Sequence, residues 1–162
     1  MKFIAVIGQR NAGKSTIIRA LTACKTVGFR GRMRDHKTNK WLEVIASSPQ
    51  ERSMPDLAKR IRDAANDQDC LGIVAALQPS YPTTHIWIED VFKIAQKHDA
   101  KCYAFAIAQP YDENPANGVN ISNLKERLSK AHIRLEKPIR SLDARRFAYL
   151  NAAIIQKAAS LF

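Results

Sequence analysis

The chain has 162 residues, 46% of them hydrophobic, which is enough for one domain with a full core and no disulfides. Since no apolar run approaches the ~20 residues of a membrane-spanning helix, we expect no membrane span. The net charge of +11, from 26 basic and 15 acidic residues, favours an acidic partner such as nucleic acid, an anionic lipid surface or another protein. The three cysteines, Cys24, Cys70 and Cys102, lack metal-ligand spacing, which predicts reduced thiols in a cytoplasmic protein.

The clearest motif is "GQRNAGKST", which follows an apolar segment that we expect to form a strand over residues 2–7. Gly8, Gly13, Lys14 and Ser15 occupy the fixed places of G-x-x-x-x-G-K-[ST]. In this motif the glycines let backbone N–H groups converge on phosphate oxygens, the lysine reaches the β- and γ-phosphates, and the hydroxyl binds Mg²⁺. A helix over residues 14–23 would point its positive end at the same anion. The residues expected to bind the nucleotide phosphates are Gly8, Asn11, Ala12, Gly13, Lys14, Ser15 and Thr16.

The other predicted elements alternate between apolar strands and amphipathic helices. In chain order they are an antiparallel hairpin over 29–34 and 41–46, a helix after the N-cap Ser53, a strand over 71–77, a helix over 84–98, a strand over 101–108, a helix over 121–130, a short strand over 133–135, and a final helix capped by Ser141. This order predicts an α/β fold of the P-loop NTPase class: a mostly parallel sheet with helices on both faces and one antiparallel hairpin strand. We expect residues 1–162 to form a single domain that binds its ligand at the carboxyl edge of the sheet.

The order of elements and three motifs resemble the Ras-like small GTPase domain. The phosphate loop is similar to that of translation-factor and Era-type GTPases, and "LEVIASSPQE" resembles the family's third motif, L-D-I-x-D-T-A-G-Q-E. In that resemblance Gln50 takes the place of the water-orienting glutamine, so Gln50 and Lys14 are the candidate catalytic residues. "QPYD" stands where the family has N-K-x-D, which implies that Asp112 binds guanine with Gln109 beside it. Family members also place an aromatic residue after the first helix near the base, and the resemblance gives this role to Phe29.

Several positions depart from the family pattern, and the departures bear on hydrolysis. Ala46 stands where the family has its Mg²⁺-linked Asp, and Pro49, which has no N–H, stands where a glycine N–H senses the γ-phosphate. The S-A-K guanine motif is missing after the expected strand over 133–135, where "LEKPIRS" follows. The resemblance therefore implies a degenerate G domain that binds GTP or GDP with Mg²⁺ held by Ser15, hydrolyses slowly or not at all, and acts as a switch or adaptor.

Two other enzyme classes fit parts of the sequence. If "HIWIED" were a strand, Glu89 and Asp90 would supply the carboxylates of an ATPase that binds ATP, although a helix there would make them ordinary first-turn acids. "KPIRSLDARR" offers Arg140, Arg145 and Arg146 as a lid of the kind that P-loop kinases use, or as a solvated basic face.

A class without catalysis also fits, because the segment from Lys25 to Lys40 is the most basic part of the chain. It holds six basic residues and Asp35 as its one acid: Lys25, Arg30, Arg32, Arg34, Lys37 and Lys40. This segment could bind an acidic protein or a nucleic acid, with Trp41 and Phe29 beside it as stacking residues or, as is commoner for such aromatics, as part of the core.

Overall fold

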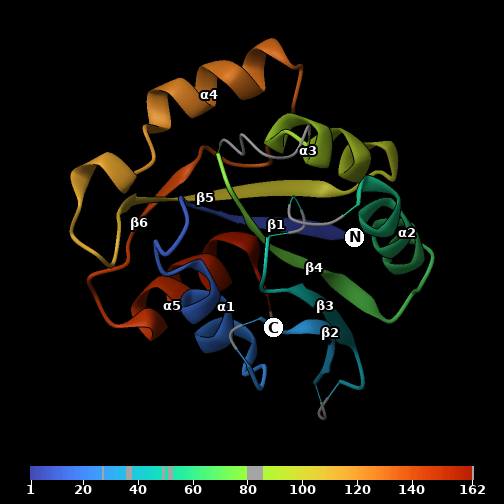
Figure 1. Cartoon of the computed structure of the whole chain (residues 1–162). Coiled ribbons are helices and arrows are strands. Elements are labelled where there is room, and N and C mark those ends of the chain that lie inside the picture. The colour runs from blue at the N-terminus through green and yellow to red at the C-terminus, as the bar shows by residue number, and fades with distance from the viewer. Residues whose placement is uncertain (27, 36–37, 49, 51–52, 80–85, 162) are drawn as a thin grey trace.

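The computed structural model describes residues 1–162 except 27, 36–37, 49, 51–52, 80–85 and 162. Six strands form one sheet in the order β2-β3-β4-β1-β5-β6 (Figure 1). Their bounds are β1 Lys2–Ile7, β2 Arg30–Arg34, β3 Trp41–Ile45, β4 Cys70–Leu77, β5 Lys101–Gln109 and β6 Arg140–Asp143. All neighbouring pairs are parallel except β2 and β3, which form the antiparallel hairpin. The predicted sheet, mostly parallel with one antiparallel strand, is confirmed.

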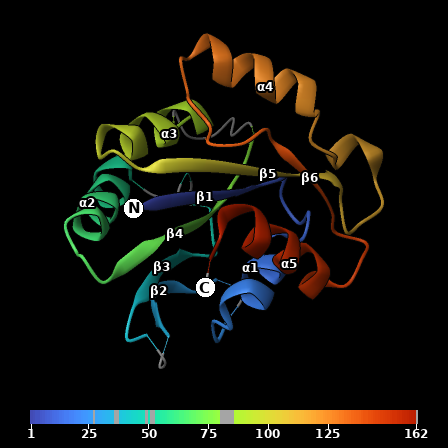
Figure 2. The same ribbon diagram turned by 180° about the vertical axis from the view of Figure 1, so that it is seen from behind.

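Helices cover both faces of this sheet, as predicted (Figures 1 and 2). Their bounds are α1 Lys14–Thr22, α2 Met54–Ala65, α3 Ile88–Lys97, α4 Ile121–Lys130 and α5 Ala148–Ala159, with a short 3₁₀ helix, η2, over Pro115–Asn117. The first core lies between the sheet and α2, α3 and α4, and the second lies between the sheet and α1 and α5. Figure 2 shows α1 and α5 side by side on their face. Within the described residues, none of these helices has the length and apolar character that crossing a membrane requires.

The central strands have apolar runs because both of their faces are covered. Five of the six residues of β1 are buried, and β1 pairs with β4 on one side and β5 on the other. Strands β1, β3, β4, β5 and β6 run in the same direction, so the segments that follow them gather at one edge of the sheet. This edge positions the candidate site.

The last strand differs from the sequence expectation. Residues 133–135 form no strand; instead Glu136 donates a single backbone hydrogen bond to Cys102 O on β5 (2.9 Å). The edge of β5 is occupied further along by β6, which contains Ser141, the residue expected to cap the final helix. "SLDARR" resembles a helix start because Ser precedes a run of helix formers, but residues 140–143 are extended by parallel pairing with β5, and α5 begins only at Ala148.

Candidate functional site

The loop after β1 has the backbone conformation that its glycines were expected to permit. Gly13 has φ 99°, a left-handed conformation at the N-cap of α1, and Asn11 has φ 60°. Gly8 lies where an added Cβ would come within 3.2 Å of both the Ala12 Cβ and the Ile107 Cδ1. The Gly8 N–H donates to Leu77 O on β4 (3.0 Å), which anchors the start of the loop to the sheet.

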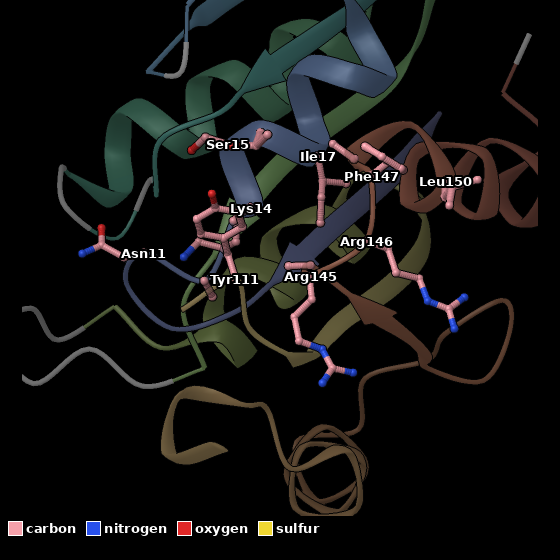
Figure 3. A pocket seen from close by; sticks show the side chains of 14 residues that line it. Asn11, Lys14, Ser15, Ile17, Tyr111, Arg145, Arg146, Phe147 and Leu150 are labelled. Atoms are coloured by element: carbon pink, nitrogen blue, oxygen red, sulfur yellow. The ribbon is translucent and has the colours of Figure 1, made fainter. Parts of the chain in front are cut away.

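A cavity of about 910 Å³ opens beside this loop (Figure 3). One end is polar and belongs to the loop and the first turn of α1: Asn11, Ala12, Gly13, Lys14, Ser15 and Thr16. The other end is lined mainly by apolar side chains and two arginines: Ile17, Tyr111, Ala144, Arg145, Arg146, Phe147, Ala148 and Leu150. This volume lies in the range of small-molecule binding sites, which is about 300–1,000 Å³.

Lys14 is the charged residue at the polar end. Its side chain is buried, and its amine donates to Gly8 O (2.8 Å) and Gln9 O (2.6 Å), so the lysine stabilises the loop that precedes it. The first-turn N–H groups of α1 have no acceptor within the helix, and Gly13 at the N-cap has no side chain with which to cap them. Together with the helix dipole, these N–H groups and the ammonium suit an anion with several oxygens.

Ser15 bears on whether Mg²⁺ fits. Its hydroxyl donates to Ala46 O at the end of β3 (2.6 Å), so this strand does reach the loop, but it presents a carbonyl rather than a carboxylate there. None of the described residues that line the cavity is acidic. Mg²⁺ would therefore be held by the Ser15 hydroxyl, phosphate oxygens and water, a set that Mg²⁺ accepts when phosphates supply the charge.

Gln50, the candidate catalytic glutamine, is fully buried and is not among the residues that line the cavity. Its amide N–H groups donate to Gln78 O (3.0 Å) and Ile86 O (3.2 Å), and its Oε1 accepts from Gln78 N (2.6 Å) and from the Ser48 hydroxyl (3.0 Å). These four bonds join the segment after β3 to the segment after β4 and leave the amide no capacity to orient a water. Pro49 lies outside the described residues.

The alternative in which Glu89 and Asp90 follow a strand is wrong, because both lie in the first turn of α3. Glu89 forms a bidentate ion pair with Arg127 of α4 (2.7 and 3.0 Å), and Asp90 accepts from the Trp87 N–H (3.2 Å). Neither residue lines the cavity. Residues 82–84, the expected helix start, lie outside the described residues.

The residues expected near the base lie at different distances from the cavity. Asp112 is exposed; its carboxylate accepts from Asn114 N (3.1 Å) and Asn117 Nδ2 (2.6 Å), and its neighbour Tyr111, rather than Asp112 itself, lines the cavity. Gln109 ends β5, where its carbonyl accepts from Ala144 N (2.8 Å). Phe29 packs against the core on the α1 side, its ring 3.3 Å from the position of an added Gly31 Cβ, and does not line the cavity.

The loops after β5 and β6 meet the loop over residues 8–16 at Gly13, an arrangement that the sequence did not predict. A Cβ added to Gly13 would lie 3.1 Å from the Ala144 Cβ and 3.6 Å from the Tyr111 Cβ. The loop after β6 is fixed from α5 by the buried Asn151, which accepts from Asp143 N (3.2 Å) and donates to Asp143 O (2.8 Å). With the last strand expected at 133–135, the residues that follow Asp143 could not be assigned to the carboxyl edge.

The two arginines of this loop are directed to Asp143. Arg145 forms two 2.9 Å bonds with its carboxylate and Arg146 lies 3.6 Å from it, and hydrogen bonding from Arg145 holds the pKa of Asp143 below its usual value. In Figure 3 both guanidinium groups point away from Lys14. In this conformation they do not form the lid of a kinase over the phosphate loop.

The basic segment contains β2, the outermost strand of the sheet on the side away from β6. Arg30, Arg32 and Arg34 alternate along β2 and so share one face. Arg32 lies 3.9 Å over the ring of Trp41, whose side chain is buried, and Arg34 donates to the Asn39 side chain (2.7 Å). Trp41 is therefore part of the core, as the commoner interpretation of its position expected. Lys37 lies outside the described residues.

No protein-family model matches this sequence, and neither the curated proteins nor the solved structures that were compared with it give a match.

Proposed function

We propose that the protein binds a purine nucleotide, with the phosphates in the loop over residues 8–16 and the rest of the nucleotide in the adjoining cavity. The observation that carries this proposal is the left-handed conformation of Gly13 (φ 99°) at the N-cap of α1, where Lys14 and the first turn of the helix line one end of a ligand-sized cavity. Mg²⁺ binds together with the phosphates through Ser15.

On binding, two groups of the chain change partners. The Lys14 amine exchanges Gly8 O and Gln9 O for oxygens of the β- and γ-phosphates, and the Ser15 hydroxyl gives up Ala46 O to reach the metal. Because Ala46 directly follows β3, release of this carbonyl would couple nucleotide binding to the position of the segment after β3. This supports a switch or adaptor rather than a rapid hydrolase.

Slow turnover or none follows from the same residues. Hydrolysis depends on a placed water and on compensation of charge around the metal. The Gln50 amide is hydrogen-bonded to Gln78 O and Ile86 O, so it does not place a water. Ala46 offers a carbonyl and no carboxylate to compensate the charge of the metal.

The test is an equilibrium titration of the full chain with fluorescent GTP, GDP and ATP, with and without Mg²⁺. We expect binding to the wild type and at least tenfold weaker binding to Lys14→Gln, which retains a hydrogen-bond donor for the loop but loses the charge. Lys157→Gln, an exposed lysine on α5, serves as the matched control and should bind as the wild type does. Equal binding by Lys14→Gln and the wild type would contradict the proposal.

A further inference from the structure

The apolar end of the cavity is too large and too hydrophobic to belong to a phosphate site. In the proposed function a triphosphate accepts hydrogen bonds from the N–H groups at the start of α1. The part of the cavity lined by Ile17, Tyr111, Phe147 and Leu150 is then left unfilled. Figure 3 shows Ile17 and Phe147 close together, with Leu150 further along α5. Phe147 is 72% exposed and Tyr111 71% exposed, although large aromatic side chains are usually buried.

These two exposed aromatic residues flank the phosphate loop directly. The Gly13 contacts with Ala144 and Tyr111 make the polar and apolar ends one continuous cavity, and the Tyr111 N–H donates to Ala12 O (3.4 Å). Phe147 stacks on Tyr149, with ring centroids 5.7 Å apart and planes 16° apart. Phe147 lines the cavity whereas Tyr149 does not, and Phe147 remains largely exposed beside Tyr149.

We infer that this apolar end binds the nucleobase by stacking on Phe147 and Tyr111, so that the protein accepts adenine and guanine nucleotides with similar affinity. The inference rests on the proposed function and replaces the guanine preference that the resemblance to small GTPases implies. Guanine N1–H and N2–H₂ need an acceptor, usually a carboxylate. None of the described residues that line this end carries a carboxylate: Arg145 and Arg146 are donors only, and the Asp112 carboxylate is engaged by Asn114 and Asn117 outside the cavity.

Stacking without contacts to the base edge is tolerant, because every base has an aromatic face. The carboxylate of Asp143 does not substitute for Asp112, since Arg145 and Arg146 both engage it. The buried Asn151 keeps the loop that carries Phe147 attached to β6, so the aromatic ring is presented from a fixed support. Phe147 therefore selects ligands that carry an aromatic base, and it does not distinguish adenine from guanine.

The experiment compares three probes, GTP, ATP and inorganic tripolyphosphate, each with Mg²⁺, by calorimetric titration of the full chain. The wild type should bind GTP and ATP within about threefold of each other. Phe147→Ala and Tyr111→Ala should each weaken both nucleotides about tenfold and leave tripolyphosphate unchanged. Both side chains are exposed, so their truncation spares the core. Trp87→Ala, which removes an exposed aromatic residue at the start of α3, is the matched control and should change none of the three affinities.

Each other outcome is decisive. If the wild type binds all three probes and Phe147→Ala and Tyr111→Ala bind nucleotides as the wild type does, the base subsite is wrong while the proposed function stands. A preference of more than tenfold for GTP that disappears in Asp112→Ala would place the base at Asp112 and overturn the inference. If the wild type binds neither nucleotide nor tripolyphosphate, the proposed function itself fails.

Discussion

Replacing Gly13 by alanine tests the conformation on which the phosphate loop depends. At φ 99° an L-residue pays at least the ~1–2 kcal/mol of a left-handed conformation. The new Cβ would lie 3.1 Å from the Ala144 Cβ, so the phosphate loop or the loop after β6 must shift by a few tenths of an ångström, whereas its 3.6 Å distance to the Tyr111 Cβ is an ordinary contact. Adding about 1 kcal/mol for this crowding gives a loss of about 2–3 kcal/mol in the free energy of unfolding.

Urea unfolding followed by circular dichroism measures this loss. With a slope of about 2 kcal/mol per molar urea, the midpoint of Gly13→Ala should fall by about 1–1.5 M. Gly28→Ala is the matched control, because nothing lies within 4 Å of its added Cβ, and its midpoint should move by less than ~0.3 M. The double variant Gly13→Ala with Ala144→Gly relieves the crowding alone. An unchanged midpoint for Gly13→Ala would refute the left-handed conformation at the start of α1.

Four other predictions follow from named contacts. Asn151→Ala leaves a backbone N–H and C=O of β6 unpaired and should lower the free energy of unfolding by about 2–4 kcal/mol in urea. Gln50→Ala breaks four hydrogen bonds, three of them buried, and should cost about 2–4 kcal/mol in the same assay. A double-mutant cycle of Glu89→Gln and Arg127→Met should give a coupling energy of about 1–2 kcal/mol, since the pair is bidentate and mostly buried. Burial raises the pKa of the Cys102 thiol to about 12, so at pH 8 mass spectrometry should show it alkylated by iodoacetamide at least ~100-fold more slowly than in urea.

Different results would correct particular parts of this description. If Gln50→Ala were as stable as the wild type, the Gln50 amide would not be held by these four bonds, and the water-orienting role that the sequence suggests would remain open to it. A coupling energy near zero would mean that Glu89 and Arg127 are not paired in solution. Rapid alkylation of Cys102 in the native protein would mean that β5 is not buried as described.

The sequence predicts the fold class and the phosphate loop because their signals are local. The loop is predicted by two glycines, a lysine and a serine at fixed spacing directly after an apolar strand. A strand that is covered on both faces is recognisable in the sequence as an apolar run. β6 gives no such signal. It has four residues, of which Leu142 alone is buried, and its extended form comes from pairing with β5.

The same distinction applies to the site. The "HIWIED" segment alternates like a strand, but Val91, Phe92 and Ala95 continue at helical spacing and bury one face of α3. Gln50 could be placed in a motif, yet its role depends on Gln78, which is 28 residues away in sequence. The aromatic residues of the cavity, Tyr111 and Phe147, become neighbours of the loop through strand pairing that no short-range pattern encodes.

The central claim, that the loop over residues 8–16 binds the phosphates of a nucleotide, is tested most directly by two-dimensional ¹H–¹⁵N NMR of the labelled chain titrated with tripolyphosphate and then with GTP, each with Mg²⁺. We predict that tripolyphosphate shifts the amide signals of Asn11, Gly13, Lys14, Ser15 and Thr16 most strongly, and that GTP shifts these and also those of Tyr111 and Phe147. Unchanged loop amides, or shifts confined to the arginines of β2, would contradict the account and would direct attention to the basic edge of the sheet.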